Sequence, residues 1–141
     1  FAFGTYMATV AEVEVMSDGT VRVRRMTSVV DAGRVVNPDT LKSQVQGGLI
    51  FGLTAALHGN ITVENGRVQQ NNFNDYRMMR INETPAIDVH IIQSSEAPGG
   101  IGEPGCTAGP PSLINAIAAA TNIRIRQLPV DRDILAGRRS V

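Results

Sequence analysis

The sequence has 141 residues, of which 43% are hydrophobic and 18% are charged, a composition typical of one soluble globular domain rather than of a disordered chain. Thirteen basic residues balance thirteen acidic ones without long charged runs, which argues against nucleic acid and anionic membranes as partners. A single cysteine, Cys106, excludes an internal disulfide and any thiolate-ligated iron–sulfur or structural zinc site within the chain.

No apolar run reaches the roughly 20 residues that a membrane helix requires, and no basic-then-apolar leader opens the sequence. We therefore expect a soluble protein, cytoplasmic or periplasmic. The first residues, from Phe1 to Val15, have the character of a strand already under way. This start predicts a fragment or a processed subunit of a larger protein.

Residues 6–15 and 21–30 are rich in Val, Thr and Ala and alternate in part between apolar and polar side chains. The intervening Ser17-Asp18-Gly19-Thr20 is typical of a turn, so the two segments predict a β-hairpin. Asn37-Pro38-Asp39 then combines a capping residue, a proline suited to the first helical position and an acidic residue, which together predict a helix start.

Apolar residues recur every four positions after this start and predict one apolar stripe that ends near Gly59. These residues are Leu41, Val45, Leu49, Leu53 and Leu57. Gly47, Gly48 and Gly52 interrupt the helix at a cost of about 1 kcal/mol each relative to alanine. Such a cost indicates a close approach, either by a tightly packed sheet or by a ligand.

The rest of the sequence predicts further strands and a second helix. Segments 61–64 and 67–70 flank Asn65-Gly66, a strong hairpin signal, and residues 87–92 predict a further strand. Residues 94–111 predict a loop, residues 112–121 an alanine-rich helix, and residues 123–128 a last strand. We expect a single domain over residues 1–141 of the α+β class, with a mixed, mainly antiparallel sheet and two main helices packed on it.

The loop contains Gly100, Gly102 and Gly105 in the spacing G-x-G-x-x-G, which also occurs in dinucleotide-binding folds. We reject that interpretation because Pro104 and the pair Pro110-Pro111 should delay the helix, and because the chain lacks alternating strands and helices. The loop instead presents one carboxylate, Glu103, between glycines and a proline. That carboxylate is a candidate general base, although most glutamates in loops are simply solvated.

Several segments occur in the order found in one enzyme family: Asp31-Ala32-Gly33 with Asn37-Pro38, Gln44-Val45-Gln46-Gly47-Gly48, Gly52-Leu53, Asn72-Phe73-Asn74-Asp75-Tyr76, Gly102-Glu103-Pro104 and Arg124-Ile125-Arg126-Gln127-Leu128-Pro129. Together they resemble the molybdenum hydroxylases of the xanthine oxidase and aldehyde oxidase family, and most of all the isoquinoline 1-oxidoreductase β-subunit branch. The resemblance spans nearly the whole chain and identifies it as a C-terminal segment of a molybdopterin-binding subunit.

The resemblance implies specific roles. Glu103 would be the base that activates a molybdenum-bound hydroxide, and the side chain of Gln44 would approach the molybdenum–pterin centre. Gly47, Gly48, Gly100 and Gly102 would let the backbone come close to the cofactor, and no residue of the chain would ligate the metal. The implied reaction is hydroxylation of an aldehyde or an N-heterocycle such as isoquinoline.

The resemblance also implies partners. The family's molybdenum subunits are several times longer, and their electrons leave through an iron–sulfur subunit. We therefore expect molybdenum–molybdopterin, in its cytosine dinucleotide form, in the complete enzyme, and an inactive, cofactor-free chain when this segment is alone. The isolated chain should also self-associate through the apolar surface that the rest of the subunit covers.

Two rival functions are weighed beside this one: a dinucleotide-binding domain, which the prolines and the order of elements disfavour, and a non-catalytic association module that keeps the fold. His58 and His90 have no neighbouring ligand spacing and are interpreted as structural. Cys106 is interpreted as an apolar filler next to the loop. Asp75 and Tyr76 either contact substrate or hold their own loop together.

Overall fold

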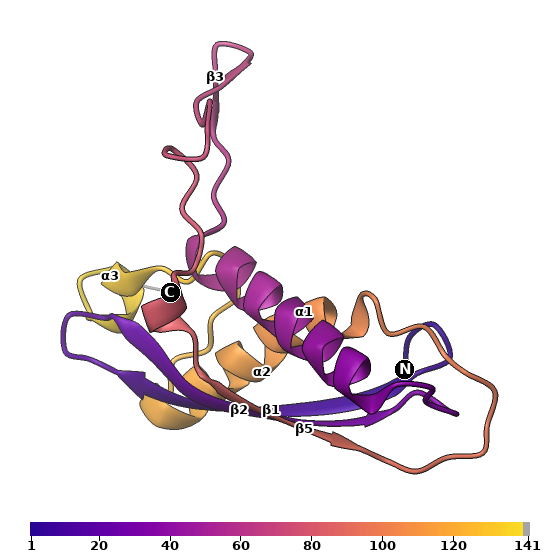
Figure 1. Cartoon of the computed structure of the whole chain (residues 1–141). Coiled ribbons are helices and arrows are strands. Elements are labelled where there is room, and N and C mark those ends of the chain that lie inside the picture. The colour runs from indigo at the N-terminus through magenta and orange to yellow at the C-terminus, as the bar shows by residue number, and fades with distance from the viewer. Residues whose placement is uncertain (140–141) are drawn as a thin grey trace.

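The computed structural model describes residues 1–139 and contains a three-stranded sheet with the strand order β1-β2-β5. Strands β1 (Tyr6–Val15) and β2 (Val21–Asp31) pair antiparallel, and β5 (Ala86–Ile91) pairs parallel with β2. Figure 1 shows the long helix α1 (Pro38–His58) lying along this sheet. The predicted α+β class is confirmed, because the sheet is mixed and most of its pairing is antiparallel.

The β1–β2 hairpin turns where predicted. Gly19 adopts a φ of +82°, and the Asp18 carboxylate accepts a hydrogen bond from the Thr20 backbone N–H at 2.9 Å. That N–H, together with the Thr20 hydroxyl, lowers the pKa of Asp18. The ladder shifts register by one residue between Glu12 and Val13, which marks a β-bulge that places Arg24 and Arg25 both at the exposed surface.

Helix α1 begins and ends as its sequence predicts. The Asn37 side chain accepts a hydrogen bond from the Thr40 backbone N–H at 3.0 Å, which satisfies one of the free donors of the first turn. At the other end, the Gly59 backbone N–H donates to the carbonyls of Thr54 and Ala55. Four of the five predicted stripe residues are buried: Leu41, Val45, Leu49 and Leu53.

Helix α2 (Pro104–Thr121) begins eight residues earlier than predicted, so the second half of the predicted loop is helical. Pro104 stands at the start of the helix, where no intrahelical N–H is needed. Pro110 and Pro111 lie inside the helix, although neither can donate to the carbonyl four residues earlier. The expectation that prolines would postpone this helix is wrong, because packing against α1 outweighs the missing hydrogen bonds.

The predicted last strand at 123–128 is also wrong. Ile125 is buried in the core and Ile123 is half-buried, which accounts for the alternating pattern, but the segment pairs with no strand of the described chain. A strand requires a hydrogen-bonded neighbour as well as a buried face. Asn122, which ends α2, adopts the left-handed conformation with a φ of 60°, as expected of a capping asparagine.

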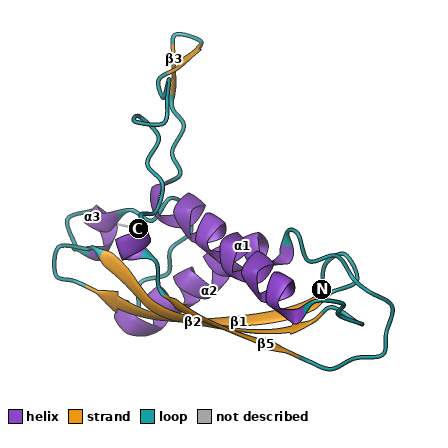
Figure 2. Ribbon diagram, viewed as in Figure 1, coloured by secondary structure: helices purple, strands orange, loops and turns teal. Residues whose placement is uncertain are grey.

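Part of the segment between α1 and the 3-10 turn η1 (Ile81–Glu83) forms an arm that projects away from the sheet and helices (Figure 2), and the chain is back against the core at Met79. Its tip is the predicted Asn65-Gly66 hairpin, with the short strands β3 (Val63–Glu64) and β4 (Arg67–Val68). The turn η1 then leads back to β5. Within residues 1–139, no helix combines the length and the apolar character that a membrane crossing would need.

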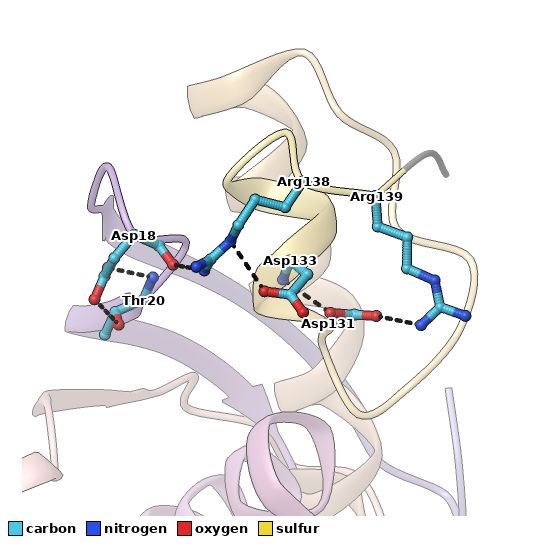
Figure 3. A network of polar contacts seen from close by, with 6 residues as sticks. All are labelled: Asp18, Thr20, Asp131, Asp133, Arg138 and Arg139. Atoms are coloured by element: carbon cyan, nitrogen blue, oxygen red, sulfur yellow. Dashed lines mark hydrogen bonds and ion pairs between the residues drawn. The ribbon is translucent and has the colours of Figure 1, made fainter.

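The end of the described chain folds back onto the first hairpin through a polar network (Figure 3). Arg138 donates to the Asp18 carbonyl at 3.0 Å and pairs with Asp133 at 3.1 Å, in and beside the short helix α3 (Arg132–Leu135). Arg139 pairs with Asp131 at 3.2 Å. These groups are largely exposed, so each pair contributes little to stability and the network chiefly orients the segment.

Candidate functional site

The loop between β5 and α2 is hydrogen-bonded along one side to the segment that links β2 and α1. Gly99 donates its backbone N–H to the Ala32 carbonyl at 2.9 Å, and Arg34 donates to the Glu96 carbonyl at 3.0 Å. Gly33 has a φ of +69°, and an added Cβ would lie 2.2 Å from the Ala97 carbonyl oxygen. Only glycine fits this contact, which explains the Asp31-Ala32-Gly33 motif by close backbone packing.

The first residues of the chain form hydrogen bonds with the same loop on its other side. The Gly100 N–H donates to the Phe3 carbonyl at 2.7 Å, and the buried Thr5 hydroxyl donates to the Gly100 carbonyl at 2.8 Å. An added Cβ at Gly99 would lie 2.5 Å from the Gly4 carbonyl oxygen. Sequence reasoning missed Phe3 and Thr5, because the pairing joins segments about 95 residues apart and leaves no local pattern.

Glu103 and Gln44 are brought to the same place. Glu103 is the residue that precedes α2; its carbonyl accepts the Thr107 N–H at 3.2 Å, while its side chain makes no capping hydrogen bond and is exposed. The Gln44 side-chain amide, from the second turn of α1, donates to the Gly102 carbonyl at 3.0 Å. Gln44 is therefore bonded to the residue that precedes Glu103, and the Glu103 side chain is exposed rather than enclosed in a cleft.

The glycines of α1 divide into two kinds. At Gly48 an added Cβ would lie 3.1 Å from the Cys106 backbone nitrogen, and at Gly52 it would lie 2.5 Å from the Cys106 carbonyl oxygen. The close approach indicated by these glycines is thus real, and the neighbour is helix α2 rather than the sheet. At Gly47, by contrast, and at Gly102 in the loop, an added Cβ would meet no atom within 4 Å.

A cavity of about 410 Å³ opens beside Gln44, between the start of α1 and the loop that links β5 and α2. Its walls include Val35, Leu41, Pro98 and Ile101, with the polar side chains of Asn37 and Thr40 at the rim of the helix start. The cavity therefore offers an apolar wall and a few hydrogen-bonding groups beside Gln44, whereas Glu103 itself does not line it. Such a combination is typical of small-molecule sites.

A second titratable group lies elsewhere. His58, at the end of α1, lines a separate cavity of about 310 Å³ together with Glu83. Burial lowers the pKa of His58, with a further contribution from the positive charge of Arg77. The Arg80 backbone N–H lowers the pKa of Glu83. Among the described residues, no group of three or more His, Cys, Asp or Glu side chains could hold a metal ion.

Known proteins resemble this chain in both sequence and fold. The family model described as "Molybdopterin cofactor-binding domain" matches residues 1–85. The chain is 41% identical over 135 residues to the membrane-bound aldehyde dehydrogenase [pyrroloquinoline-quinone] of Gluconacetobacter polyoxogenes, a match that covers 94% of this chain and 18% of that protein. It is 37% identical over 126 residues to the beta chain of isoquinoline 1-oxidoreductase of Brevundimonas diminuta, covering 89% and 16% respectively.

Among solved structures, the aldehyde oxidoreductase from Desulfovibrio gigas superposes with a TM-score of 0.81 and 26% identity, over 94% of this chain and 15% of that one. The chain thus spans less than a fifth of the length of the proteins it matches. Neither the comparisons nor the sheet, which is not doubly wound, supports a dinucleotide-binding fold. Its sequence, its fold and the matched family model place this chain in the molybdopterin cofactor-binding domain family.

Proposed function

We propose that this chain supplies the general base and part of the cofactor pocket of a molybdenum-dependent oxidoreductase that hydroxylates aldehydes or N-heterocycles such as isoquinoline. The observation that supports this most strongly is the hydrogen bond from Gln44 to the Gly102 carbonyl. This bond joins α1 to the loop that contains Glu103. In α1, a Cβ added at Gly47 would meet no atom within 4 Å.

The residues around this bond fit a pterin cofactor. A flat, polar ligand of this kind needs approachable backbone and side-chain amides, and Gly47 and Gly102 each leave open space where a side chain would otherwise stand. Gln44 contributes both an amide donor and a carbonyl acceptor. We propose Gln44, Gly47 and Gly102 as cofactor contacts, together with Gly48 and Gly100, whose immediate neighbours in this chain are α2 and Phe3.

When bound, the molybdenum cofactor would supply the oxygen-transfer and two-electron redox chemistry. The part of this chain is proton transfer: an ionised Glu103 accepts a proton at a carboxylate oxygen as the nucleophilic oxygen forms its bond to the substrate carbon. The basicity of a carboxylate rises when its surroundings exclude water. Because Glu103 is exposed in this chain, the groups that exclude water must come from the substrate, the cofactor or the rest of the enzyme.

The larger assembly is part of the proposal. Relatives with names such as "Nicotine 6-hydroxylase large subunit", from Paenarthrobacter nicotinovorans, are parts of multi-subunit enzymes. We propose that residues 1–141 form a single domain at the C-terminal end of the molybdenum subunit, which works with an iron–sulfur subunit in the cytoplasm or periplasm. The resemblance to the isoquinoline branch supports the cytosine dinucleotide form of the cofactor. The segment alone should be inactive and free of cofactor.

The decisive experiment replaces the proposed base in the complete enzyme. We expect Glu103→Gln, which keeps the shape and removes the base, to lower turnover at least about 10²-fold with unchanged molybdenum content. Glu96→Gln is the matched control, because Glu96 is an exposed carboxylate in the same loop with no ion-pair partner among the described residues. Normal turnover in the Glu103 variant would remove Glu103 from the mechanism.

Metal and cofactor analysis of the same complete enzyme tests the pocket. We expect molybdenum and a pterin bearing a cytosine nucleotide, measured by elemental analysis and by mass spectrometry of the released cofactor. Pyrroloquinoline quinone in their place would contradict the proposal; it appears in the name of one relative. An enzyme without any of these groups would instead favour an association module that keeps only the fold.

A further inference from the structure

The two faces of the sheet differ in how far the described chain buries them. Along β1 the odd-numbered residues turn toward the helices, and Ala11 is buried in the common core with Val23 and Met26 of β2. The even-numbered residues turn the other way and are exposed. We call this second face the open face, because no element within residues 1–139 covers it.

One end of the open face is charged and already neutralised. Glu14 pairs with Arg24, and Arg25 pairs with both Glu12 and Asp88. Three carboxylates thus lie beside two arginines, and the exposed Arg22, in register with Glu14, completes the balance of charge. This charged end is well solvated as it stands, and it offers no excess charge to attract a partner.

The other end of the open face is apolar. It comprises the exposed side chains of Tyr6, Val10, Val29 and Ile92, together with Phe1, whose ring lies 4.5 Å from that of Tyr6. Val10 is 68% exposed and Tyr6 is 61% exposed, although both stand on regular strand positions. Two polar side chains lie among them: Asp31, in register with Tyr6, accepts a hydrogen bond from the Gly33 N–H, and the exposed His90 lies in register with Val29.

The apolar end lies next to the candidate site. Phe3 and Thr5, which directly precede β1, hold Gly100 of the loop, and Ala32, which directly follows β2, holds Gly99. A structure that covers the apolar end therefore lies beside the strand ends that bind Gly99 and Gly100.

We infer that the apolar end of the open face is a permanent interface, and that its occupant is an uncharged, apolar surface of the same molybdenum subunit, contributed by residues outside this segment. This inference rests on the proposed function. The matched proteins have more than four fifths of their length outside the part that this chain covers. A contiguous patch of mainly apolar side chains is typical of a permanent interface, whereas transient partners usually meet a more polar surface.

Photo-crosslinking in the complete molybdenum subunit identifies the occupant. A photoreactive residue at Val10 should crosslink to peptides of the same polypeptide outside this segment. The same residue at Arg22, an exposed position that pairs in register with Glu14 at the charged end, should give few such crosslinks. Mixed isotope-labelled and unlabelled subunits reveal a crosslink between two copies, and that result would overturn the inference, as would the absence of any crosslink from Val10.

Hydroxyl-radical footprinting of the unmodified complete subunit avoids the risk that a variant fails to fold. Oxidation of Tyr6 should be severalfold slower than in the 141-residue chain diluted until it is monomeric, and equal rates would sink the inference. Molybdenum analysis of the same sample separates the two proposals. A metal-loaded subunit with a reactive Tyr6 overturns only the interface, whereas a protected Tyr6 without molybdenum overturns only the cofactor function.

Discussion

Glu103 owes its position to its neighbours more than to its own contacts. Pro104 is the first residue of α2, and the hydrogen bond from Gln44 holds the Gly102 carbonyl on the other side. The carboxylate itself has no hydrogen bond among the described residues and is exposed. The backbone around Glu103 is therefore held by its neighbours, whereas the carboxylate makes no hydrogen bond within residues 1–139 and can accept a proton.

His58 leads to a prediction about stability and pH. Because its pKa in the folded chain is lowered below the ordinary 6.5, the unfolded chain binds more protons between 6.5 and the lowered value. The free energy of unfolding should thus be unaffected by this group above about pH 7 and should fall as the pH decreases through that window. Denaturant unfolding of the wild-type chain and of His58→Gln at pH 7.5 and 5.5 measures the difference.

The variant should lose less stability than the wild type over this interval. His90→Gln, at an exposed position on β5 outside this cavity, controls for the general effect of replacing an imidazole. Loss of stability from Glu83 belongs to more acidic solutions, because the pKa of that carboxyl lies below 4.5 in the folded chain. Identical pH profiles for wild type and His58→Gln would contradict the assignment.

At the scale of elements, the contact between α1 and α2 decides the shape of the site. Gly48 and Gly52 on α1 face Gly105 and Cys106 on α2, and added Cβ atoms would overlap backbone. Two helices can approach this closely only where side chains are absent. The contact places the first turn of α2 beside Gly48 and Gly52, in the middle of α1, while Gln44 binds the Gly102 carbonyl just before Glu103.

Gly52→Ala tests this contact. The new methyl group would lie 2.5 Å from the Cys106 carbonyl oxygen, so the helices must separate. We expect a loss of about 1–3 kcal/mol in the free energy of unfolding, measured with denaturant. A neutral or stabilising effect would show that the close packing is not required.

Gly47→Ala is the matched control on the same helix, because its methyl group would meet open space. Here the better helix propensity of alanine should raise the stability of the chain by up to about 1 kcal/mol. The same variant in the complete enzyme should lower the molybdenum content if Gly47 contacts the cofactor. Stability and metal content would then change in opposite directions.

At the scale of the whole molecule, one face of the sheet is buried by helices and the other is open. The isolated 141-residue chain should therefore self-associate through the apolar end of the open face, where a second copy takes the place of the missing surface. Sedimentation or light scattering should show species larger than a monomer. A strictly monomeric chain at high concentration would contradict this expectation.

Val10→Asp should weaken self-association, because it places a charge in the middle of the patch. Val63→Asp on the projecting arm is the control: Val63 is 65% exposed, close to the 68% of Val10, but it lies far from the open face. If both variants weaken association equally, the contact does not belong to the sheet.

Several features of this protein follow from the sequence alone. The Ser17–Thr20 turn, the Asn37 cap and the four-residue spacing from Leu41 to Leu53 are local signals, and the hairpin and α1 agree with them. The family also follows, because its motifs are short runs of neighbouring residues. Glu103, Gln44 and the glycines were identified as site residues from those motifs, and their functional roles remain predictions.

Other features depend on contacts between distant residues. Three features arise from contacts between segments far apart in the chain: the start of α2 at Pro104, the close α1–α2 contact, and the hydrogen bonds that join Phe3 and Thr5 to Gly100. The segment at 123–128 has the pattern of a strand but lacks a partner. Local patterns record which face of a segment is apolar, whereas the tertiary structure decides what that face meets, because burial and backbone pairing are free energies shared between segments.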